Sequence, residues 1–273
     1  MYNDKGFLSR YLNNLRSIDW KKIPETSQDA IIITRSLNVP FIWIDSLCIV
    51  QDDNEDWRRE SSRMASIFAG AYLTLAATAS PNMDGGFFGE AEPHYTGVEM
   101  SVTLERNTYN IHARRRLLHL SIEQSTDDSL AEMLPLLTRG WVFQERLLSS
   151  RVLHFTQNEV IWECTGATFC QCGNSNSPVH LKARFRPGNL QSVSDACGMW
   201  YQLVEQYSRL RLSFDKDIFP ALSGLAHKFT EATPDLGRYV AGLWETSILT
   251  DLAWVPDPTF PLRKRPTTWR APT

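Results

Sequence analysis

The chain has 273 residues, of which 42% are hydrophobic and 22% are charged, and its formal net charge is −3. A chain this rich in apolar residues is not a disordered tail, and 28 basic against 31 acidic residues give no general electrostatic attraction to nucleic acid or an anionic membrane. Five cysteines in this length do not make a disulfide scaffold. We therefore expect an ordinary globular chain.

Neither end of the chain nor its longest apolar stretch predicts export or membrane insertion. Residues 1–15 contain Asp4 and lack the continuous apolar run of a secretory signal. The longest apolar stretch, residues 30–50, is interrupted by Arg35 and Asp45, which a membrane span tolerates poorly. Together with the odd number of cysteines, these features predict a cytoplasmic protein without a membrane span.

Helical and strand patterns alternate along the chain, which predicts an α/β core with a more helical C-terminal third. Ser27 can cap the first helix, although its apolar run would suit a strand equally well. The expected helices are 27–35, 57–71, 138–149, 195–210 and 218–231. The expected strands are a buried, parallel one at 41–44, another buried one at 72–79, a hairpin of 98–104 with 109–113, and a pair of 152–155 with 159–164. Loops are expected at 82–89 and 173–187.

The common catalytic and nucleotide-binding motifs are absent from the sequence. It contains no G-x-x-x-x-G-K, G-x-G-x-x-G, H-E-x-x-H or G-x-S-x-G. Phosphate-loop, Rossmann, zincin and α/β-hydrolase activities are therefore disfavoured.

The cysteines offer one candidate metal site and one candidate nucleophile. Cys164, Cys170 and Cys172, with His154 and His180, could supply thiolates and an imidazole to zinc. Their spacing matches no common C-x-x-C pair, so free thiols are the favoured interpretation and no metal is expected. Cys48 lies in an apolar run that suits a small core residue better than an activated thiolate.

Two segments carry more polar side chains than a core requires. Asp45 follows the expected strand 41–44, and open α/β sheets bind ligands at the carboxyl ends of their strands. A helix or turn cap explains Asp45 equally well. In the segment from Arg139 to Arg146, one helical turn places Trp141 and Glu145 on the same face. A Glu–Arg pair on a solvated surface is the alternative there.

These segments resemble the fungal heterokaryon incompatibility (HET) domain. The resemblance lies in FIWIDSLCIVQDDNEDWRRESSRMASIFAGA, then TRGWVFQERLLSSRVLHF, then VIWEC, and it covers roughly Ile23 to Cys164. The stretches YSRLRLSFDKDIFPALSGLAHKF and YVAGLWETSILTDLAWVP resemble what commonly follows that domain. We therefore expect a HET domain at 1–172 and a helical extension at 173–273. The family's opening strand and its usual C-terminal continuation are not found, so the chain looks truncated at both ends.

The resemblance implies a role in fungal non-self recognition and programmed cell death. HET domains are regarded as distant relatives of the TIR domain, a flavodoxin-like sheet flanked by helices, and some TIR domains cleave NAD with a glutamate four residues after a tryptophan. By that analogy Glu145 is the catalytic residue, and NAD is a substrate rather than a bound cofactor. Asp45, Trp141, Arg139 and Arg146 are the substrate-binding candidates: Asp45 for a ribose hydroxyl, and either arginine for the pyrophosphate. Trp141 either packs against the nicotinamide or only holds the helix in place.

Two other functions remain open at this point. The chain could signal without catalysis, by self-association or by binding other incompatibility proteins. It could also be an inactive fragment, given the missing N-terminal strand.

Overall fold

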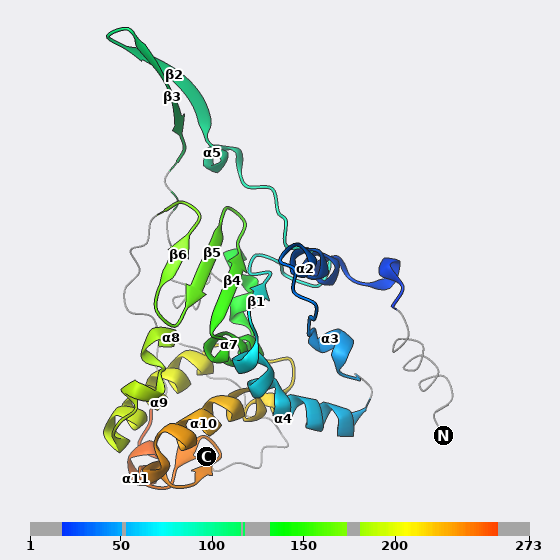
Figure 1. Ribbon diagram of the computed structural model, residues 1–273. Helices are drawn as coiled ribbons and strands as arrows, with labels where there is room; N and C mark the ends of the chain where they lie inside the picture. Colours follow the sequence, from blue (N-terminus) through cyan, green and yellow to red (C-terminus); the bar gives the residue numbers. More distant parts are fainter. Residues whose placement is uncertain (1–17, 51–52, 116, 118–131, 174–180, 256–273) are drawn as a thin grey trace.

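A four-stranded mixed sheet lies at the middle of the molecule (Figure 1). The computed structural model describes residues 18–50, 53–115, 117, 132–173 and 181–255. The strand order is β1-β4-β5-β6, in which β1 runs parallel to β4 and the other two pairs are antiparallel. These strands are β1 (Thr74–Ala76), β4 (Arg151–Phe155), β5 (Val160–Cys164) and β6 (Thr168–Cys170). The predicted pair around residues 157–158 is confirmed, whereas the strand expected at 72–79 is shorter.

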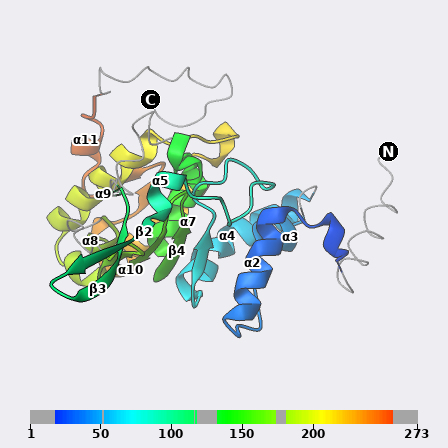
Figure 2. The ribbon, with the colours of Figure 1, turned by 90° about the horizontal axis from the view of Figure 1, so that it is seen from above.

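Helices flank this sheet. The helices of the C-terminal region, α8 to α11, lie on the opposite side from α2 and α3 (Figure 2). The helices are α2 (Glu25–Ser36), α3 (Asp45–Cys48), α4 (Asn54–Gly70), α5 (Pro93–Thr96), α7 (Gly140–Leu148), α8 (Leu181–Arg184), α9 (Val193–Ser208), α10 (Pro220–Ala232) and α11 (Ile248–Asp251). Short 3₁₀ turns are η1 (Trp20–Lys22), η3 (Pro135–Thr138), η4 (Pro187–Asn189), η5 (Asp215–Asp217) and η6 (Pro234–Leu236). The expected α/β fold with a more helical C-terminal region is confirmed.

The helix starts follow local capping chemistry, with one difference from expectation. The Asp53 side chain accepts hydrogen bonds from the backbone N–H groups of Glu55 and Asp56 at 2.8 and 3.1 Å, so the acidic cluster does begin α4. In contrast, Ser27 does not cap α2. That helix begins two residues earlier, directly after Pro24, and Ser27 is buried within it. A short α8 also interrupts the loop expected at 173–187.

The strand expected at 41–44 is wrong. In the structure this segment pairs with no described strand; Phe41 is 85% exposed, and Ile44 leads directly into α3. Its backbone is extended at Ile44, yet β1 is the edge strand of the sheet and its described neighbour is β4. A run of apolar residues indicates a tendency to be buried, but it does not supply a strand to pair with.

The main hydrophobic core joins α7 to the C-terminal helices. Phe143 and Leu147 of α7 belong to one buried cluster with Leu203 of α9 and Leu225 of α10. Trp200 and Trp244 are almost fully buried in it and meet edge to face, with ring centroids 5.4 Å apart. Because α7 and the C-terminal helices share this core, the region after residue 172 supports the helix on which the candidate catalytic residue lies. The domain boundary at 172 stays a prediction.

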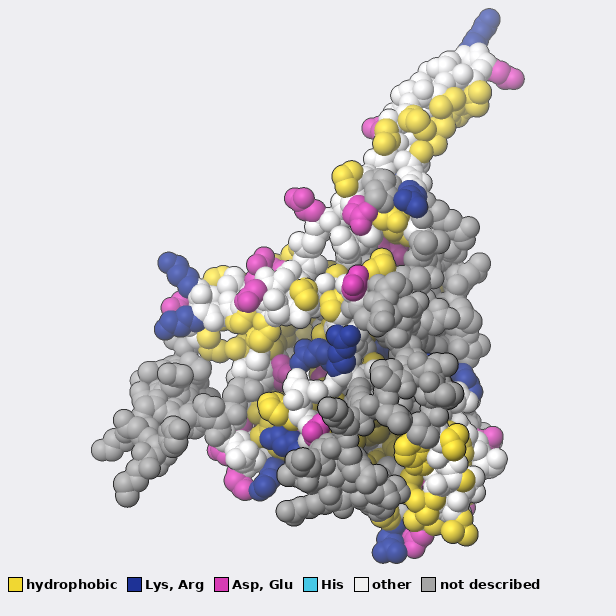
Figure 3. Space-filling view, turned by 180° about the vertical axis from the view of Figure 1, so that it is seen from behind, with side chains coloured by type: hydrophobic (Ala, Val, Ile, Leu, Met, Phe, Trp, Pro, Cys, Tyr) yellow, Lys and Arg dark blue, Asp and Glu magenta, His cyan; other side chains and the backbone are white. Residues whose placement is uncertain are grey.

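A hairpin of β2 (Val98–Leu104) and β3 (Asn107–Ala113) projects from the body, as Figure 1 shows. Its predicted pairing is confirmed, with Met100 opposite Ile111 and Val102 opposite Tyr109. Since side chains alternate along a strand, these four residues share one face, and Figure 3 shows hydrophobic side chains along one side of the arm. Met100, Tyr109 and Ile111 are all exposed. A second, two-residue hairpin pairs β7 (Tyr239–Val240) with β8 (Leu243–Trp244).

No helix in the described part of the chain is long and apolar enough to cross a membrane.

Candidate functional site

The N-terminus of α7 is fixed against the segment that follows α9. Gly140 N–H donates to the carbonyl of Arg211 at 2.8 Å, and Arg211 N–H donates to the carbonyl of Thr138 at 2.7 Å. A Cβ added at Gly140 would lie 2.6 Å from Cδ2 of Leu212, so a larger residue there would force the Leu212 side chain to shift. These contacts fix the start of α7 at Gly140, and Arg139 is its N-cap residue.

Trp141, in the first turn of α7, is held by a hydrogen bond and an aromatic contact. Its indole N–H donates to Oδ2 of Asp217 at 3.0 Å. Its ring meets Trp57 of α4 edge to face, with centroids 6.5 Å apart, and the Lys216 ammonium lies 5.1 Å from the centroid of the Trp57 ring. The half-buried Trp141 is thus part of an aromatic wall between α4 and α7, with a cation beside it.

Glu145, one helical turn after Trp141, has an unusual electrostatic setting. The pKa of its carboxyl is raised from 4.5 to about 7, chiefly by burial and also by the charge of Asp45, while the charge of Arg139 opposes the rise. The structure therefore brings the predicted residues Asp45, Arg139 and Glu145 close enough for their charges to interact. Asp45 is the exposed first residue of α3, and its Oδ1 accepts a hydrogen bond from the Ser46 N–H at 2.7 Å.

Arg146, the other arginine considered for the pyrophosphate, pairs with a buried carboxylate instead of joining this group. Its side chain is 6% exposed and donates hydrogen bonds to Glu163 of β5. Nε of Arg146 lies 2.9 Å from Oε2 of Glu163, and Nη2 lies 2.7 Å from Oε1. The physical reason is the helical period: residues 145 and 146 differ by one position and therefore point to different sides of α7. The guanidinium is already committed to a buried carboxylate.

Glu163 lies at the centre of a buried charged network. His154 Nε2 lies 3.2 Å from its Oε2, while His154 Nδ1 contacts the Thr78 hydroxyl at 3.0 Å. Burial alone would raise the pKa of Glu163, but Arg146 and the His154 hydrogen bond hold it well below 4.5. Lys182 Nζ lies 3.7 Å from the same carboxylate, and burial lowers the pKa of this lysine to about 8. This network joins α7, β4, β5 and α8 inside the protein.

Sequence reasoning missed several neighbours of the candidate site. Trp57 was expected only as an apolar residue of its helix, and nothing in the sequence pointed to Asp217 or Lys216. Their approach to α7 depends on how the segment after α9 folds back, which no local pattern encodes. Potential metal ligands lie elsewhere, at the end of the sheet farther from α7, where Glu159, Cys170 and Cys172 come together.

A half-buried carboxyl with a pKa near 7 can remove or hold a proton at neutral pH, and when ionised it can stabilise a nearby cation. Arg139 and Lys216 are cations in this region, and Trp57 and Trp141 offer aromatic surface. The arrangement therefore combines a titratable carboxyl with nearby cations and aromatic surface.

Comparison with protein families identifies the family of this chain. The family model described as heterokaryon incompatibility protein (HET) matches residues 8–145, from before α2 into α7, and so includes Asp45, Arg139, Trp141 and Glu145. No curated protein and no solved structure is significantly similar to the chain. Since the matched residues make up half of the sequence, the chain belongs to the heterokaryon incompatibility (HET) family.

Proposed function

We propose that this protein cleaves NAD and acts in fungal non-self recognition and programmed cell death, with Glu145 as its catalytic carboxylate. Membership of the HET family supports the biological role, and the relation of HET to TIR domains motivates the reaction. The observation that carries the catalytic assignment is the Glu145 carboxyl itself, whose pKa is raised to about 7 by burial and by the charge of Asp45, against the opposing charge of Arg139.

The proposed reaction needs one carboxylate and no metal-bound intermediate. The glycosidic C–N bond breaks, its electron pair leaves with neutral nicotinamide, and the ribosyl centre becomes an oxocarbenium-like cation that ionised Glu145 stabilises. Water then adds to that carbon, and Glu145 accepts the proton that the water releases. The products are ADP-ribose, nicotinamide and a proton. A base with a pKa near 7 is matched to this last step at neutral pH.

The remaining residues have proposed positioning roles. Trp141, fixed by its hydrogen bond to Asp217, packs against the nicotinamide ring. Arg139 pairs with the pyrophosphate, because a guanidinium matches phosphate geometry. Asp45 accepts a hydrogen bond from a ribose hydroxyl.

The test is nicotinamide release from NAD by the purified chain at high protein concentration, followed by chromatography. Glu145→Gln keeps the side-chain size and removes the charge, so we expect release to fall by about 10²–10³-fold. Glu205→Gln, which removes an exposed carboxylate paired with Arg209 on α9, is the control and should leave the rate unchanged. Equal rates for wild type and Glu145→Gln, or no release from a cooperatively folded wild type, would refute the catalytic proposal.

Signalling without catalysis is the second candidate, and the exposed apolar face of the β2–β3 hairpin favours it. An exposed apolar surface on a projecting element is typical of association sites. In that case cell death after expression in a fungal host would survive Glu145→Gln and would be lost in Met100→Glu/Ile111→Glu, which charges the hairpin face. The enzymatic candidate predicts loss of death signalling in Glu145→Gln.

A further inference from the structure

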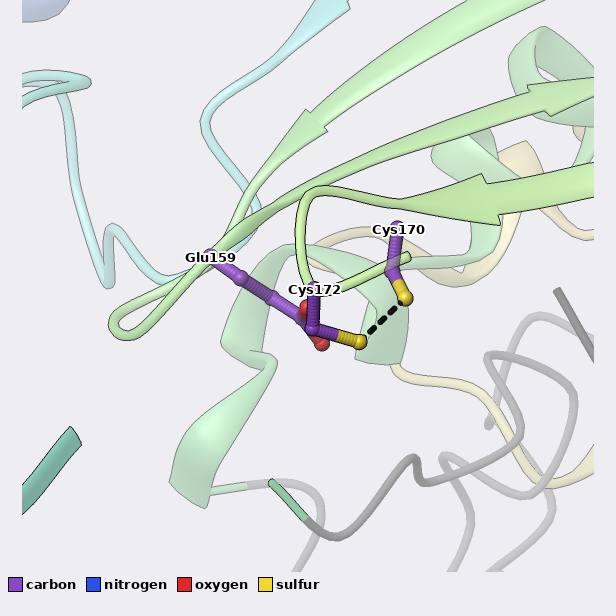
Figure 4. A group of neighbouring side chains, drawn as sticks. All are labelled: Glu159, Cys170 and Cys172. Atoms are coloured by element: carbon purple, nitrogen blue, oxygen red, sulfur yellow. Dashed lines mark hydrogen bonds between the residues drawn. The ribbon is translucent and has the colours of Figure 1, made fainter. Parts of the chain in front are cut away.

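Three side chains with metal-binding atoms converge at the end of the sheet farther from α7. The Sγ atoms of Cys170 and Cys172 lie 2.6 Å apart, and one Glu159 carboxylate oxygen lies with them in a group whose members are all within 4.8 Å of one another. Figure 4 shows Glu159 reaching across from the start of β5 to the loop that carries Cys172. None of the three belongs to the proposed NAD site.

The backbone after β6 folds so that two cysteines separated by one residue face each other. Gln171 N–H donates to the Val160 carbonyl at 2.9 Å, which keeps the loop against β5. Gly173 N–H then donates to the Cys170 carbonyl at 3.0 Å, and Gly173 has a φ of +82°, a conformation that favours glycine. The chain therefore turns at this point instead of continuing as a strand, and the two thiols converge.

Glu159 is placed independently by the turn between β4 and β5. Thr156 N–H donates to the Glu159 carbonyl at 3.1 Å, and Glu159 N–H donates to the Thr156 hydroxyl at 3.3 Å. The residue is only 9% exposed. The turn therefore holds the Glu159 carboxylate within reach of the two thiols, and a carboxylate and two thiolates are ligands that zinc accepts.

We propose that Glu159, Cys170 and Cys172 bind a zinc ion, with a water molecule or a further ligand in the fourth position. Zinc takes thiolates at about 2.3 Å and carboxylate oxygens at about 2.0–2.2 Å in a tetrahedral arrangement. Two thiolates on one tetrahedral zinc lie roughly 3.7 Å apart, so the sulfurs must separate by about 1 Å, which side-chain rotation provides. Each thiol gives up its proton on binding, so affinity rises with pH.

This ligand set differs from the one considered in the sequence. Cys164 lies at the opposite end of β5, and His154 is occupied by Thr78 and Glu163 in the buried network. The site instead combines a cysteine pair from one loop with a glutamate from the neighbouring turn. It would tie the start of β5 to the end of β6, the edge strand of the sheet.

The test uses the full chain, reduced with a phosphine and freed of metal, then titrated with Zn²⁺ against a chromophoric chelator. We expect one equivalent of zinc per chain. Cys170→Ser, Cys172→Ser and Glu159→Gln should each weaken binding about ten-fold or more, and Cys48→Ser, which removes an exposed thiol, is the matched control and should change nothing. With Co²⁺ as the probe, wild type should show a thiolate-to-cobalt charge-transfer band that both cysteine variants lose or weaken.

A second measurement avoids dependence on the folding of the variants. Thiol alkylation of wild type, read by mass spectrometry, should show that Zn²⁺ protects Cys170 and Cys172 and leaves Cys48 reactive. The proposal is overturned if Zn²⁺ protects neither cysteine, if the Cys170→Ser/Cys172→Ser double variant binds zinc as tightly as wild type, or if the two thiols form a disulfide that resists reduction and no zinc binds.

Discussion

Glu145 on α7 and Glu163 on β5 both carry a carboxyl group, but their surroundings shift its pKa in opposite directions. Burial by itself raises the pKa of each carboxyl, although Glu163 is fully buried and Glu145 is half-buried. At Glu163 the buried guanidinium of Arg146 reverses that effect, whereas at Glu145 the nearby charge of Asp45 adds to it. The difference teaches that burial raises the pKa of a carboxyl in both places. The charges next to it then decide whether it stays ionised as a structural anion or exchanges a proton near neutral pH.

The largest expected effect is on the free energy of unfolding when Glu163 is replaced. Glu163→Gln removes the only carboxylate described in the network and leaves Arg146 and Lys182 buried without it, so we expect a loss of about 3–5 kcal/mol in the free energy of unfolding. Urea denaturation at pH 7 measures it. The double variant Glu163→Gln/Arg146→Met should recover part of the loss, because it removes a buried charge that has lost its partner. A loss of less than about 1 kcal/mol would show that the network is not structural.

At Glu145, we expect removal of the charge to increase the free energy of unfolding rather than to decrease it. Its pKa is about 7 in the folded chain and 4.5 in the unfolded chain, so the folded state holds a proton that the unfolded state releases between these values. Folding therefore becomes less favourable as pH rises from 4.5 to 7, and above pH 7 the cost is fully present at about 3 kcal/mol.

Glu145→Gln should accordingly stabilise the protein at pH 8, by up to about 3 kcal/mol, and should stabilise it by less than about 1 kcal/mol at pH 5. Urea denaturation of both proteins at the two pH values measures this, with Glu205→Gln as the exposed control. A destabilised Glu145→Gln at pH 8 would place Glu145 among the structural carboxylates instead.

The smallest expected effects come from the two charged neighbours of Glu145. Asp45→Asn removes a negative charge and should lower the pKa of Glu145, whereas Arg139→Gln removes a positive charge and should raise it. The midpoint of the pH dependence of nicotinamide release should move in opposite directions in the two variants, each by about 0.5 pH unit. Shifts in the same direction would contradict the electrostatic assignment of the site.

The sequence predicted the local elements of the structure better than its long-range contacts. The residues around Trp141 and Glu145 have helical spacing and the two hairpin strands alternate loosely, and both predictions are confirmed. The strand at 41–44 failed because its apolar residues do not specify a pairing partner. The ion pair of Arg146 with Glu163 was not predicted, because the two residues lie on different elements and no pattern links them.

The candidate site was predictable only in part for the same reason. Asp45 and Glu145 are distant in sequence, and the family resemblance, rather than any spacing, suggested that they lie near each other. Of the proposed zinc ligands, Cys170 and Cys172 were considered in the sequence but set aside, because their spacing is not a common metal-binding one. Glu159 was not considered, because it comes from a different turn. These contacts depend on the pairing of β4, β5 and β6, which a linear pattern does not reveal.

The parallel pair of β1 and β4 has a consequence for how the protein folds. Thr74 and Ser149, whose hydroxyls lie 2.7 Å apart beside this pair, are separated by 75 positions in the chain. Closing so long a loop is slow compared with the formation of a hairpin, which takes about 1–10 μs. We therefore expect β2 and β3 to pair early in folding, between two strands that have not yet met. The apolar face of that hairpin would then be available to other chains before the carboxyl of Glu145 acquires its final surroundings.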